Sequence, residues 1–544
     1  MPADAGKHLK HSLPRAGGDA PQTLSARIDL GAAHMREHQW EAAKRQFQTL
    51  LEEDPHRLGV RLFLVECLLG LGDLECAQKV LAEANPPGAK EGRYAGLRPH
   101  QVELWAQLAL ALLATQRLDQ AEEACGFALR LDAQHFRAMA HLGSIRLAQS
   151  RLGEAVLQFR RVVAAHPTEE RAHLLLITAL ARTGDRLGAC QEIARVLQQA
   201  PTSFLVHKSV MGPLYSLGCW DEYRAEIERY RQVEPGLAYL DYEQSFADLL
   251  HGNLLQGWQH FEARLEVSSD LRPHRTFQEP AWQGEAFQDR TLLLWTEQGI
   301  GDTLMFLRYL PMVKALGGRV LLEAQGSVLD VAGTCPGLDG LVLAGTPPPP
   351  FDLQASIMSL PWIFRTELAT IPDNVPYVQV PKEVPHREGL RDLLATAGEH
   401  TRIGLVWGGN PAHARDSERS ISAPALAPLA ALPGVTWFSF QVDSAEVPPL
   451  PNLVSLAPCL GDFSDTAYAL SEMDLLISVD TSVAHLAGAL GIPTLLLITR
   501  QPDYRWLLDR EDSPWYPTLR VYRQPSFGDW ASALQQIVSD LTQE

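Results

Sequence analysis

Three short segments in the second half of the chain carry side chains whose types and spacing could do chemistry. They are residues 297–302, 408–420 and 480–485, and each follows an apolar run typical of a buried strand. Glycines let the backbone approach a bound molecule, and the N–H groups at the start of a helix attract phosphate. Carboxylates and an imidazole in the same turns could accept a proton. The three turns therefore predict a site that binds an anionic ligand and moves a proton.

The first segment holds the candidate proton acceptor. Asp302 follows a Gly-x-Gly sequence at the start of a helix that we expect over residues 303–316. One interpretation makes Asp302 the N-cap of that helix. The other makes it a general base that faces a cleft and takes the proton from an attacking hydroxyl group. The neighbouring residues that we expect on the acceptor side of this cleft are Glu297, Gln298, Gly299 and Gly301.

The second segment combines hydroxyl groups with a histidine. Thr481 or Ser482 can cap a helix that runs to Leu490, and helical spacing places His485 three residues after Ser482, away from the apolar stripe. A helix start with these side chains is suited to holding a diphosphate. The alternative is that His485 is an ordinary core histidine. Asp480, which precedes Thr481, belongs to the same predicted donor-binding group.

The third segment supplies cations. Gly408 and Asn410 follow an apolar run, and Arg415 and Arg419 come shortly afterwards. Arginine binds phosphate through paired N–H groups. We therefore predict that Gly408, Asn410 and Arg419 contribute to the same anion site. The alternative is a surface loop with solvated charges.

The elements that position these turns are short strands that alternate with helices. Apolar, leucine-rich and β-branched runs of this kind predict βαβ units with buried parallel strands. The expected strands are residues 291–295, 319–323, 340–343, 402–406, 436–440, 475–479 and 494–498. A polar, proline-containing segment divides them, so we expect two Rossmann-like α/β lobes over residues 291–385 and 386–544. Ligands bind at the carboxyl ends of the strands in such sheets, which is where the three turns lie.

The first half of the chain repeats with a period of 34 residues. Alanines with this spacing, apart from one interval of 44, are Ala43, Ala77, Ala121, Ala155 and Ala189. The ten extra residues belong to a Pro/Gly loop that we expect over residues 86–99. The period predicts paired amphipathic helices that stack into a superhelix over residues 24–267. A disordered lead over residues 1–23 precedes this array, and a linker over residues 268–290 follows it. Such arrays bind extended peptides or partner helices.

Composition argues against several classes of function. The 544 residues carry a formal net charge of −18, which argues against a protein that binds the phosphate backbone of nucleic acids. Seven cysteines are scattered without a Cys-x-x-Cys pair, which predicts buried, reduced thiols and no zinc site. The sequence shows neither a signal peptide nor a transmembrane segment. We therefore expect a soluble, cytoplasmic protein without a metal, and the sequence does not indicate its oligomeric state.

Taken together and in order, the three turns resemble those of the heptosyltransferase-like glycosyltransferases of family 9. The resemblance is greatest to bacterial proteins that join tetratricopeptide repeats to such a module. The residues that carry it are 297–302, 406–410, 419–420, 480–487, 503–506 and 512–516. It implies a GT-B fold, in which two lobes face a cleft. It also implies metal-independent, inverting transfer from a nucleotide-sugar donor on the C-terminal lobe, with no other cofactor. In this family Asp302 would be the base, and Thr481 and His485 would belong to the donor-phosphate loop.

The chain departs from this family at two places in the expected donor pocket. Ser482 stands where these enzymes have glycine, and Gly408-Gly409-Asn410 followed by arginines stands where they have lysine. Both changes weigh against a heptose donor and a lipopolysaccharide acceptor. The domain order is similar to that of the O-linked N-acetylglucosamine transferases, in which repeats recruit proteins. We therefore expect the repeats to bind a protein or peptide acceptor, for example a surface or flagellar protein modified before export.

Two other interpretations stay open. The second half could be an inactive, nucleotide-sensing part of a repeat scaffold. It could also be an epimerase of the UDP-sugar type, because such enzymes share the two-lobed architecture. Substitution of Asp302 would separate a scaffold from an enzyme, and product analysis would separate an epimerase from a transferase.

Overall fold

The computed structural model describes residues 23–84, 95–267, 275–413, 415–442 and 446–543. The expected disordered lead up to residue 22, residue 85 with residues 86–94 of the Pro/Gly loop, and residues 268–274 of the linker lie outside the described residues. The chain divides into two compact units, Met1–Pro201 and Thr202–Glu544. The first is helical, and the second contains further helices of the same kind followed by two parallel sheets.

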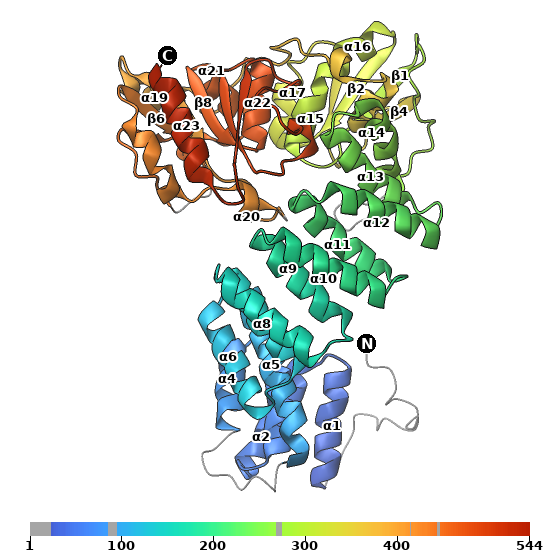
Figure 1. Ribbon diagram of the computed structural model, residues 1–544, viewed down its shortest axis with the longest axis vertical. Helices are drawn as coiled ribbons and strands as arrows, with labels where there is room; N and C mark the ends of the chain where they lie inside the picture. The colour runs from blue at the N-terminus through green and yellow to red at the C-terminus, as the bar shows by residue number, and fades with distance from the viewer. Residues whose placement is uncertain (1–22, 85–94, 268–274, 414, 443–445, 544) are drawn as a thin grey trace. The chain divides into compact units, whose positions relative to one another are not determined.

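The first unit consists of helices that pack in consecutive pairs (Figure 1). They are α1 (Leu24–Arg36), α2 (Trp40–Glu53), α3 (Leu58–Gly70), α4 (Leu74–Glu83), α5 (Arg98–Ala114), α6 (Leu118–Leu131), α7 (Phe136–Ala148), α8 (Leu152–Ala165), α9 (Glu170–Arg182) and α10 (Arg186–Gln199), with the short 3-10 turn η2 (Ala95–Leu97) before α5. The Pro/Gly loop ends earlier than expected, because Arg98 and Pro99 form the first turn of α5. Proline is favoured there, since the N–H group that it lacks would have no helical partner.

The pairs are held together where a small residue faces a large one. Phe47 and Phe159 are fully buried and fill the space beside Gly31 and Gly143, where an added Cβ would lie 2.5 Å from the phenyl ring. All five of the repeating alanines are fully buried too. The 34-residue period therefore marks the places at which two helix backbones come too close for a larger side chain.

The second unit begins with helices that continue the array. They are α11 (Phe204–Ser216), α12 (Trp220–Val233), α13 (Ala238–Leu250) and α14 (Leu254–Phe261), followed by the 3-10 turn η3 (Glu262–Leu265). At the position of the sixth alanine stands Tyr223, which is buried and whose hydroxyl group donates to the carbonyl oxygen of Glu243 at 3.1 Å. The helical array is therefore present as predicted, and its last helices belong to the same compact unit as the sheets.

Two parallel sheets follow the helices (Figure 1). The first has the order β3-β2-β1-β4, with β1 (Thr291–Trp295), β2 (Arg319–Ala324), β3 (Gly340–Leu343) and β4 (Leu353–Ser356). The second has the order β10-β9-β8-β5-β6-β7, with β5 (Thr401–Val406), β6 (Val435–Ser439), β7 (Leu453–Ser455), β8 (Leu475–Val479), β9 (Thr494–Ile498) and β10 (Leu519–Arg523). The predicted class, a helical array followed by α/β lobes, is thus confirmed.

Helices and 3-10 turns connect the strands. Those of the first lobe are α15 (Ile300–Phe306), η4 (Leu307–Tyr309), α16 (Leu310–Ala315), η5 (Gly326–Val328), α17 (Leu329–Ala332), η6 (Ile357–Ser359), α18 (Leu360–Ile363) and η7 (Leu368–Thr370). Those of the second are α19 (Arg387–Leu394), η8 (Ala395–Ala397), α20 (Asp416–Arg419), η9 (Ala423–Ala431), η10 (Ala457–Cys459), α21 (Phe463–Ser471), α22 (Ser482–Leu490), η11 (Tyr504–Trp506) and α23 (Trp530–Gln543).

The expected strands are all present, with ends displaced by at most about one residue. The strands missed from the sequence are β4, β7 and β10, which all lie at sheet edges. Edge strands face neighbours on one side only, so their sequences are short or partly polar and lack a continuous apolar run. The single helix expected over residues 303–316 is wrong, because it is broken into α15, η4 and α16. Pro311 lies in the first turn of α16, where it cannot donate a helical hydrogen bond.

The last repeat helices share one hydrophobic core with the two lobes. Trp258 and Phe261 of α14 are almost fully buried in the same cluster as Phe306 of the first lobe and Tyr504 and Trp515 of the second. The ring centroid of Trp258 lies 5.9 Å from that of Phe306 and 5.8 Å from that of Tyr504. The end of the array is therefore a structural part of the sheet-containing unit.

The cysteines only partly meet the expectation of buried thiols. Four are buried, namely Cys67, Cys125, Cys219 and Cys335, whereas Cys76 is exposed on α4, so the prediction is wrong at that position. Burial raises the pKa of the Cys335 thiol to about 12.

Within the described ranges, no helix is both long and apolar enough to cross a lipid bilayer.

The fit between glycine and phenylalanine can be tested with two glycines of neighbouring helices. Gly143→Ala in α7 would push a methyl group into the Phe159 ring, and we expect it to lower the free energy of unfolding by about 1–3 kcal/mol. Gly126→Ala in α6 is the control, because its new Cβ would meet only the end of Arg130, at 3.5 Å. Better helix propensity should raise stability there by about 0.5–1 kcal/mol. Urea denaturation measures both, and equal effects would contradict the packing argument.

Candidate active site

Two helix starts, one from each lobe, meet at the carboxyl ends of the strands. Helix α15 follows β1, helix α22 follows β8, and the two helices pack against each other (Figure 1). A Cβ added at Gly301 of α15 would lie 2.8 Å from Cδ2 of His485 in α22. Gly301 therefore makes room for a side chain of the other lobe, rather than for a ligand as its place in the Gly-x-Gly turn had suggested.

Asp302 is not the N-cap of α15, as one interpretation of the sequence had it; the N-cap is Gly299, and Asp302 is the third residue of the helix. Its Oδ2 accepts a hydrogen bond from the backbone N–H of Gly299 at 2.9 Å, as the acidic residue of a capping box does. Its Oδ1 forms an ion pair with Nη2 of Arg505, which comes from the second lobe. The side chain is 12% exposed. One carboxylate oxygen is therefore fixed by the helix, and the other faces the second lobe.

Arg505 is the main residue of this site that the sequence prediction missed. It belongs to η11, after β9, and pairs with Asp503 as well as Asp302. Burial lowers its pKa to about 10. Its Nε is buried and has no hydrogen-bond partner among the described residues. A buried donor without an acceptor is costly, so this position favours a ligand that supplies a hydrogen-bond acceptor.

The second carboxylate beside Arg505, that of Asp503, is destabilised in its charged form by its surroundings. Burial, followed by the negative charge of Asp480, raises the pKa of Asp503 well above its ordinary value. Arg415 and Arg419 act in the opposite direction. The second lobe thus concentrates acidic and basic side chains around one point, at the carboxyl ends of β8 and β9.

His485 is buried, although it lies off the apolar stripe of its helix, because that face meets α15. Its Nδ1 lies 2.8 Å from the hydroxyl oxygen of Tyr516, and its ring stacks on Trp506 with centroids 5.2 Å apart. Its Nε2 lies 3.9 Å from Oδ1 of Asp480. Burial lowers the pKa of His485 to about 4. The imidazole is therefore neutral near pH 7 and cannot attract a phosphate by its charge.

The start of α22 remains partly exposed. Thr481 occupies the N-cap position but its side chain makes no capping hydrogen bond; its Oγ1 lies 3.4 Å from Oγ of Ser478. Asp480, Thr481 and Ser482 are all partly accessible. The N–H of Ala484 already donates to the carbonyl oxygen of Thr481 at 3.1 Å. The N–H groups of Ser482 and Val483, at the start of the helix, have no helical partners and are available to a ligand.

The third predicted turn contributes less directly. Asn410 is exposed and its Oδ1 accepts from the N–H of Ala412 at 2.9 Å, while the N–H of Gly408 donates to Oε1 of Gln441 at 3.1 Å. Arg419 pairs with Asp416 at 3.2 Å. Its charge still acts on Asp503 and His485, which places Arg419 beside the site and leaves Asn410 at the surface.

A repeat helix touches the loop that carries Arg505. The hydroxyl group of Tyr215, in α11, donates to the carbonyl oxygen of Pro502 at 2.8 Å. The guanidinium of Arg415 lies over the Tyr215 ring at 5.1 Å and donates to the carbonyl oxygen of Gln501 at 2.8 Å. The array therefore supports the loop that carries Asp503 and Arg505 in the second lobe.

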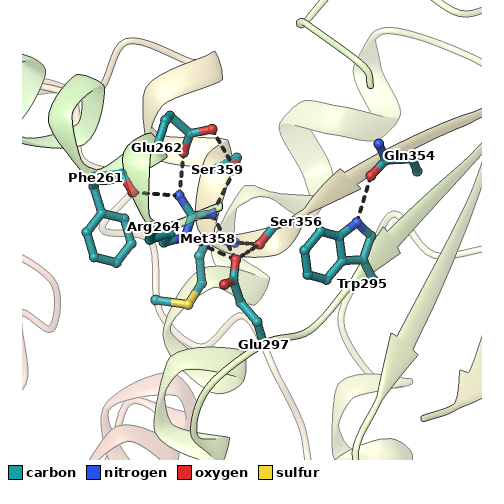
Figure 2. A network of polar contacts seen from close by, with 9 residues as sticks. All are labelled: Phe261, Glu262, Arg264, Trp295, Glu297, Gln354, Ser356, Met358 and Ser359. Carbon is teal, nitrogen blue, oxygen red and sulfur yellow. Dashed lines mark hydrogen bonds and ion pairs between the residues drawn. The ribbon is translucent and has the colours of Figure 1, made fainter. Parts of the chain in front are cut away.

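Glu297 and Gln298 face a cavity on the other side of the same turn. The cavity measures about 510 Å³ and lies between η3 and the ends of β1 and β4. Arg264, which is 2% exposed, donates to Oε1 of Glu297 at 2.8 Å and to Oγ of Ser359 at 2.8 Å. Figure 2 shows the guanidinium of Arg264 between Glu262, Glu297 and Ser359. Although burial alone would lower it, these two glutamates raise the pKa of Arg264.

The predicted residues thus separate into three groups. Asp302, Asp480, Thr481, Ser482, His485 and Arg419 gather where the lobes meet, Glu297 and Gln298 line the cavity, and Gly408 and Asn410 lie towards the surface. Gly299 and Gly301 shape the turn between the first two groups. The sequence signal for Arg505 was its place in segment 503–506, one of those that carry the family resemblance, after a strand whose carboxyl end faces the same edge. Arg264 offered no such signal.

Two family models match parts of the helical region. Residues 34–98 match the tetratricopeptide repeat, and residues 89–200 match the bacterial transcriptional activator domain. The first match agrees with the 34-residue period and the helix pairs. The chain contains tetratricopeptide repeats.

Other proteins are similar to longer parts of the chain. Protein FlbA of Caulobacter vibrioides is 23% identical over 428 residues, which cover 72% of this chain and 70% of that protein. A tetratricopeptide repeat protein from Parabacteroides merdae aligns with 45% of this chain and 93% of its own, with 12% identity and a TM-score of 0.33. A glycosyl transferase of family 9 from Veillonella parvula aligns with 48% of this chain and 99% of its own, with 11% identity and a TM-score of 0.37.

The neutral state of His485 can be tested through the pH dependence of stability. The folded chain resists protonation down to about pH 4, whereas an unfolded histidine binds a proton below about pH 6.5. Stability from this group is therefore present above pH 6.5 and is lost as the pH falls towards 4, by up to about 3 kcal/mol. We expect His485→Gln to remove that part of the pH dependence in urea denaturation between pH 7 and pH 4.

The control for this measurement is His251→Gln, at an exposed histidine of the same unit. It should leave the pH dependence as in the native chain. An unchanged slope in His485→Gln would show that the buried imidazole does not contribute to acid sensitivity.

Proposed function

We propose that this protein is a glycosyltransferase that moves a sugar from a nucleotide-sugar donor to a hydroxyl group of a protein acceptor. The observation that carries the proposal is the pairing of Asp302, from the first lobe, with Arg505 from the second. It brings a candidate base within reach of a buried cation that has an unused donor group. The exposed start of α22 lies in the same lobe as Arg505, after β8.

In the proposed step, the acceptor oxygen forms a bond to the anomeric carbon of the donor sugar. The bond between that carbon and the phosphate oxygen breaks, and its electron pair leaves with the nucleotide. Asp302 accepts the proton of the acceptor hydroxyl group. Attack from the side opposite the leaving phosphate inverts the anomeric configuration.

The chain offers side chains that suit the leaving phosphate without a metal. Arg505 and Arg419 supply positive charge, and the first turn of α22 supplies N–H groups and the positive end of a helix dipole. For the base to act, Arg505 must turn from Asp302 to the phosphate. The unpartnered Nε of Arg505 supports this, since a phosphate oxygen would satisfy it.

The repeats support a protein acceptor in this proposal. Tetratricopeptide arrays bind protein segments on their helix surfaces, and here the array ends in the same core as the lobes. We propose that the reaction takes place in the cytoplasm.

The second candidate, an inactive nucleotide-sensing scaffold, is favoured by one observation: both oxygens of Asp302 are engaged within the protein.

Asp302→Asn separates the two candidates. Asparagine can still accept the N–H of Gly299, so the cap of α15 is retained while the basic charge is lost. We expect kcat to fall by about 10²- to 10⁴-fold, with nucleotide affinity retained or increased because Arg505 loses a competing partner, measured as sugar transfer and as calorimetric binding of the nucleotide. A scaffold would show no transfer by either protein.

The matched control is Asp339→Asn in the same lobe. Asp339 also combines an ion pair, with Lys314 at 2.6 Å, and a backbone hydrogen bond, from the N–H of Val320 at 2.8 Å. It lies beside β2 and takes no part in the proposed step. If it lowered the transfer rate as much as Asp302→Asn, loss of a lobe ion pair and not loss of a base would be the cause.

A screen of melting temperature identifies the donor. UDP, GDP, ADP, CMP and dTDP sugars are added in turn to the full chain, and a ligand that binds the native state raises its melting temperature. At a concentration one hundred times its Kd, a donor adds about 2.7 kcal/mol of stability. Arg505→Met should abolish the shift, because it removes the cation proposed to hold the phosphate. A panel without any shift would contradict the proposed function.

The contribution of the repeats is tested by removal of residues 1–201. The cut falls between the two compact units, so the remaining chain should fold and hydrolyse the donor as before. We expect transfer of radiolabelled sugar to proteins of the source organism to be lost. Removal of residues 1–267 should instead unfold the rest, because Trp258 and Phe261 would leave the shared core. Equal loss of hydrolysis and transfer in the shorter truncation would contradict recruitment by the repeats.

A further inference from the structure

The cavity beside Glu297 is built jointly by the array and the first lobe. On one side lie Arg264 and Leu265 of η3, together with Val267; on the other lie Trp295, at the end of β1, and Trp362, in α18. The indole N–H of Trp295 donates to Oε1 of Gln354 at 2.8 Å, which fixes the orientation of its ring (Figure 2). At about 510 Å³, the cavity has the size of a typical ligand site.

The charged groups of this cavity are already paired. Arg264 binds Glu262 at 2.6 Å and Glu297 at 2.8 Å, and Arg275 binds Glu323 at 2.8 Å. A phosphate or another strongly charged ligand would have to break one of these pairs, at the cost of leaving a buried charge alone. The cavity therefore suits a neutral ligand.

The remaining surface suits a polypeptide. Three amide side chains line the cavity, those of Gln283, Gln298 and Gln354, and amides can both donate to and accept from a peptide backbone. Leu265 exposes 40% of its surface, and it forms an aliphatic wall with Val267 and Ile363. Such a wall gains free energy by covering apolar side chains, which a peptide carries and a hydroxyl-covered sugar does not.

The cavity borders the turn that holds the candidate base. Thr296, Glu297 and Gln298 line it, and the next residue, Gly299, donates its N–H to Asp302. Asp302 is the fifth residue after Glu297, so the backbone between them spans at most ~18 Å. A peptide bound in the cavity would therefore have to extend beyond it by no more than about five residues to bring a hydroxyl group to Asp302.

We propose that this cavity binds uncharged residues of the acceptor polypeptide next to the hydroxyl group that is modified. The proposal rests on the proposed transferase function and identifies where its acceptor is held. The repeat array then contributes one wall of the acceptor site itself, through η3, in addition to recruiting the acceptor.

The test is photo-cross-linking of the full chain, with p-benzoylphenylalanine in place of the exposed Gln283 on the cavity wall. The probe is an equimolar pool of dodecapeptides that each contain one Thr among randomised uncharged residues, and no nucleotide is added. Leu265→Glu, in the same background, places a charge on the apolar wall, and we expect cross-linking to fall at least about tenfold. Leu341→Glu is the control, since Leu341 is 38% exposed on β3 and lies outside the cavity; it should change the yield less than about twofold.

Two results would overturn the proposal. One is that no peptide is cross-linked, or that Leu265→Glu leaves the amount of cross-linked peptide unchanged. The other is protection of the cavity from cross-linking by methyl glycosides of glucose, galactose, mannose and N-acetylglucosamine, which would identify a saccharide site. Because the assay contains no donor, its failure is distinct from failure of the proposed function, which the melting-temperature shift with nucleotide sugars reports separately.

Discussion

Burial of guanidinium groups is the constraint on which the second unit depends. Arg264, Arg308 and Arg505 are each at most 9% exposed, and a charge withdrawn from water is stable only where its N–H groups find acceptors. The acceptors come from distant parts of the chain. Each arginine therefore fixes several elements relative to one another, and the elements cannot separate without leaving a buried charge unsatisfied.

The three arginines join different elements. Arg264 connects the last repeat to the turn after β1 through Glu297. Arg308 donates to the carbonyl oxygens of Met305 at 2.7 Å and Pro372 at 3.1 Å, and also to that of Trp515, so it joins the first lobe to the end of the second. Arg505 connects η11 to Asp302. Together they connect the segments before, within and after α15, the helix whose start carries the candidate base, to the last repeat and to the second lobe.

Much of the fold could be predicted from the sequence, because helix contacts and buried strands each leave a local pattern of residues. Ala155 and the other repeating alanines mark helix contacts that recur every 34 residues, and buried central strands such as β8 have continuous apolar runs. The candidate site was harder, because its geometry depends on residues far apart in the sequence. Arg505 is 203 residues from Asp302. His485 does lie off the apolar stripe of α22, yet that face meets α15, so the side chain is buried where a single helix would expose it.

The glycines before Asp302 show how the same residues can be interpreted in two ways. A Gly-x-Gly turn before a helix suggests a phosphate cradle, but here Gly301 accommodates the His485 ring, and Gly299 donates its N–H to Asp302. That hydrogen bond holds Oδ2 in place, so the carboxylate cannot rotate freely. Only Oδ1 can exchange partners, and its present partner is a cation that a phosphate oxygen can attract away. A helix cap and a proton acceptor are therefore compatible in one side chain, because they use different oxygens.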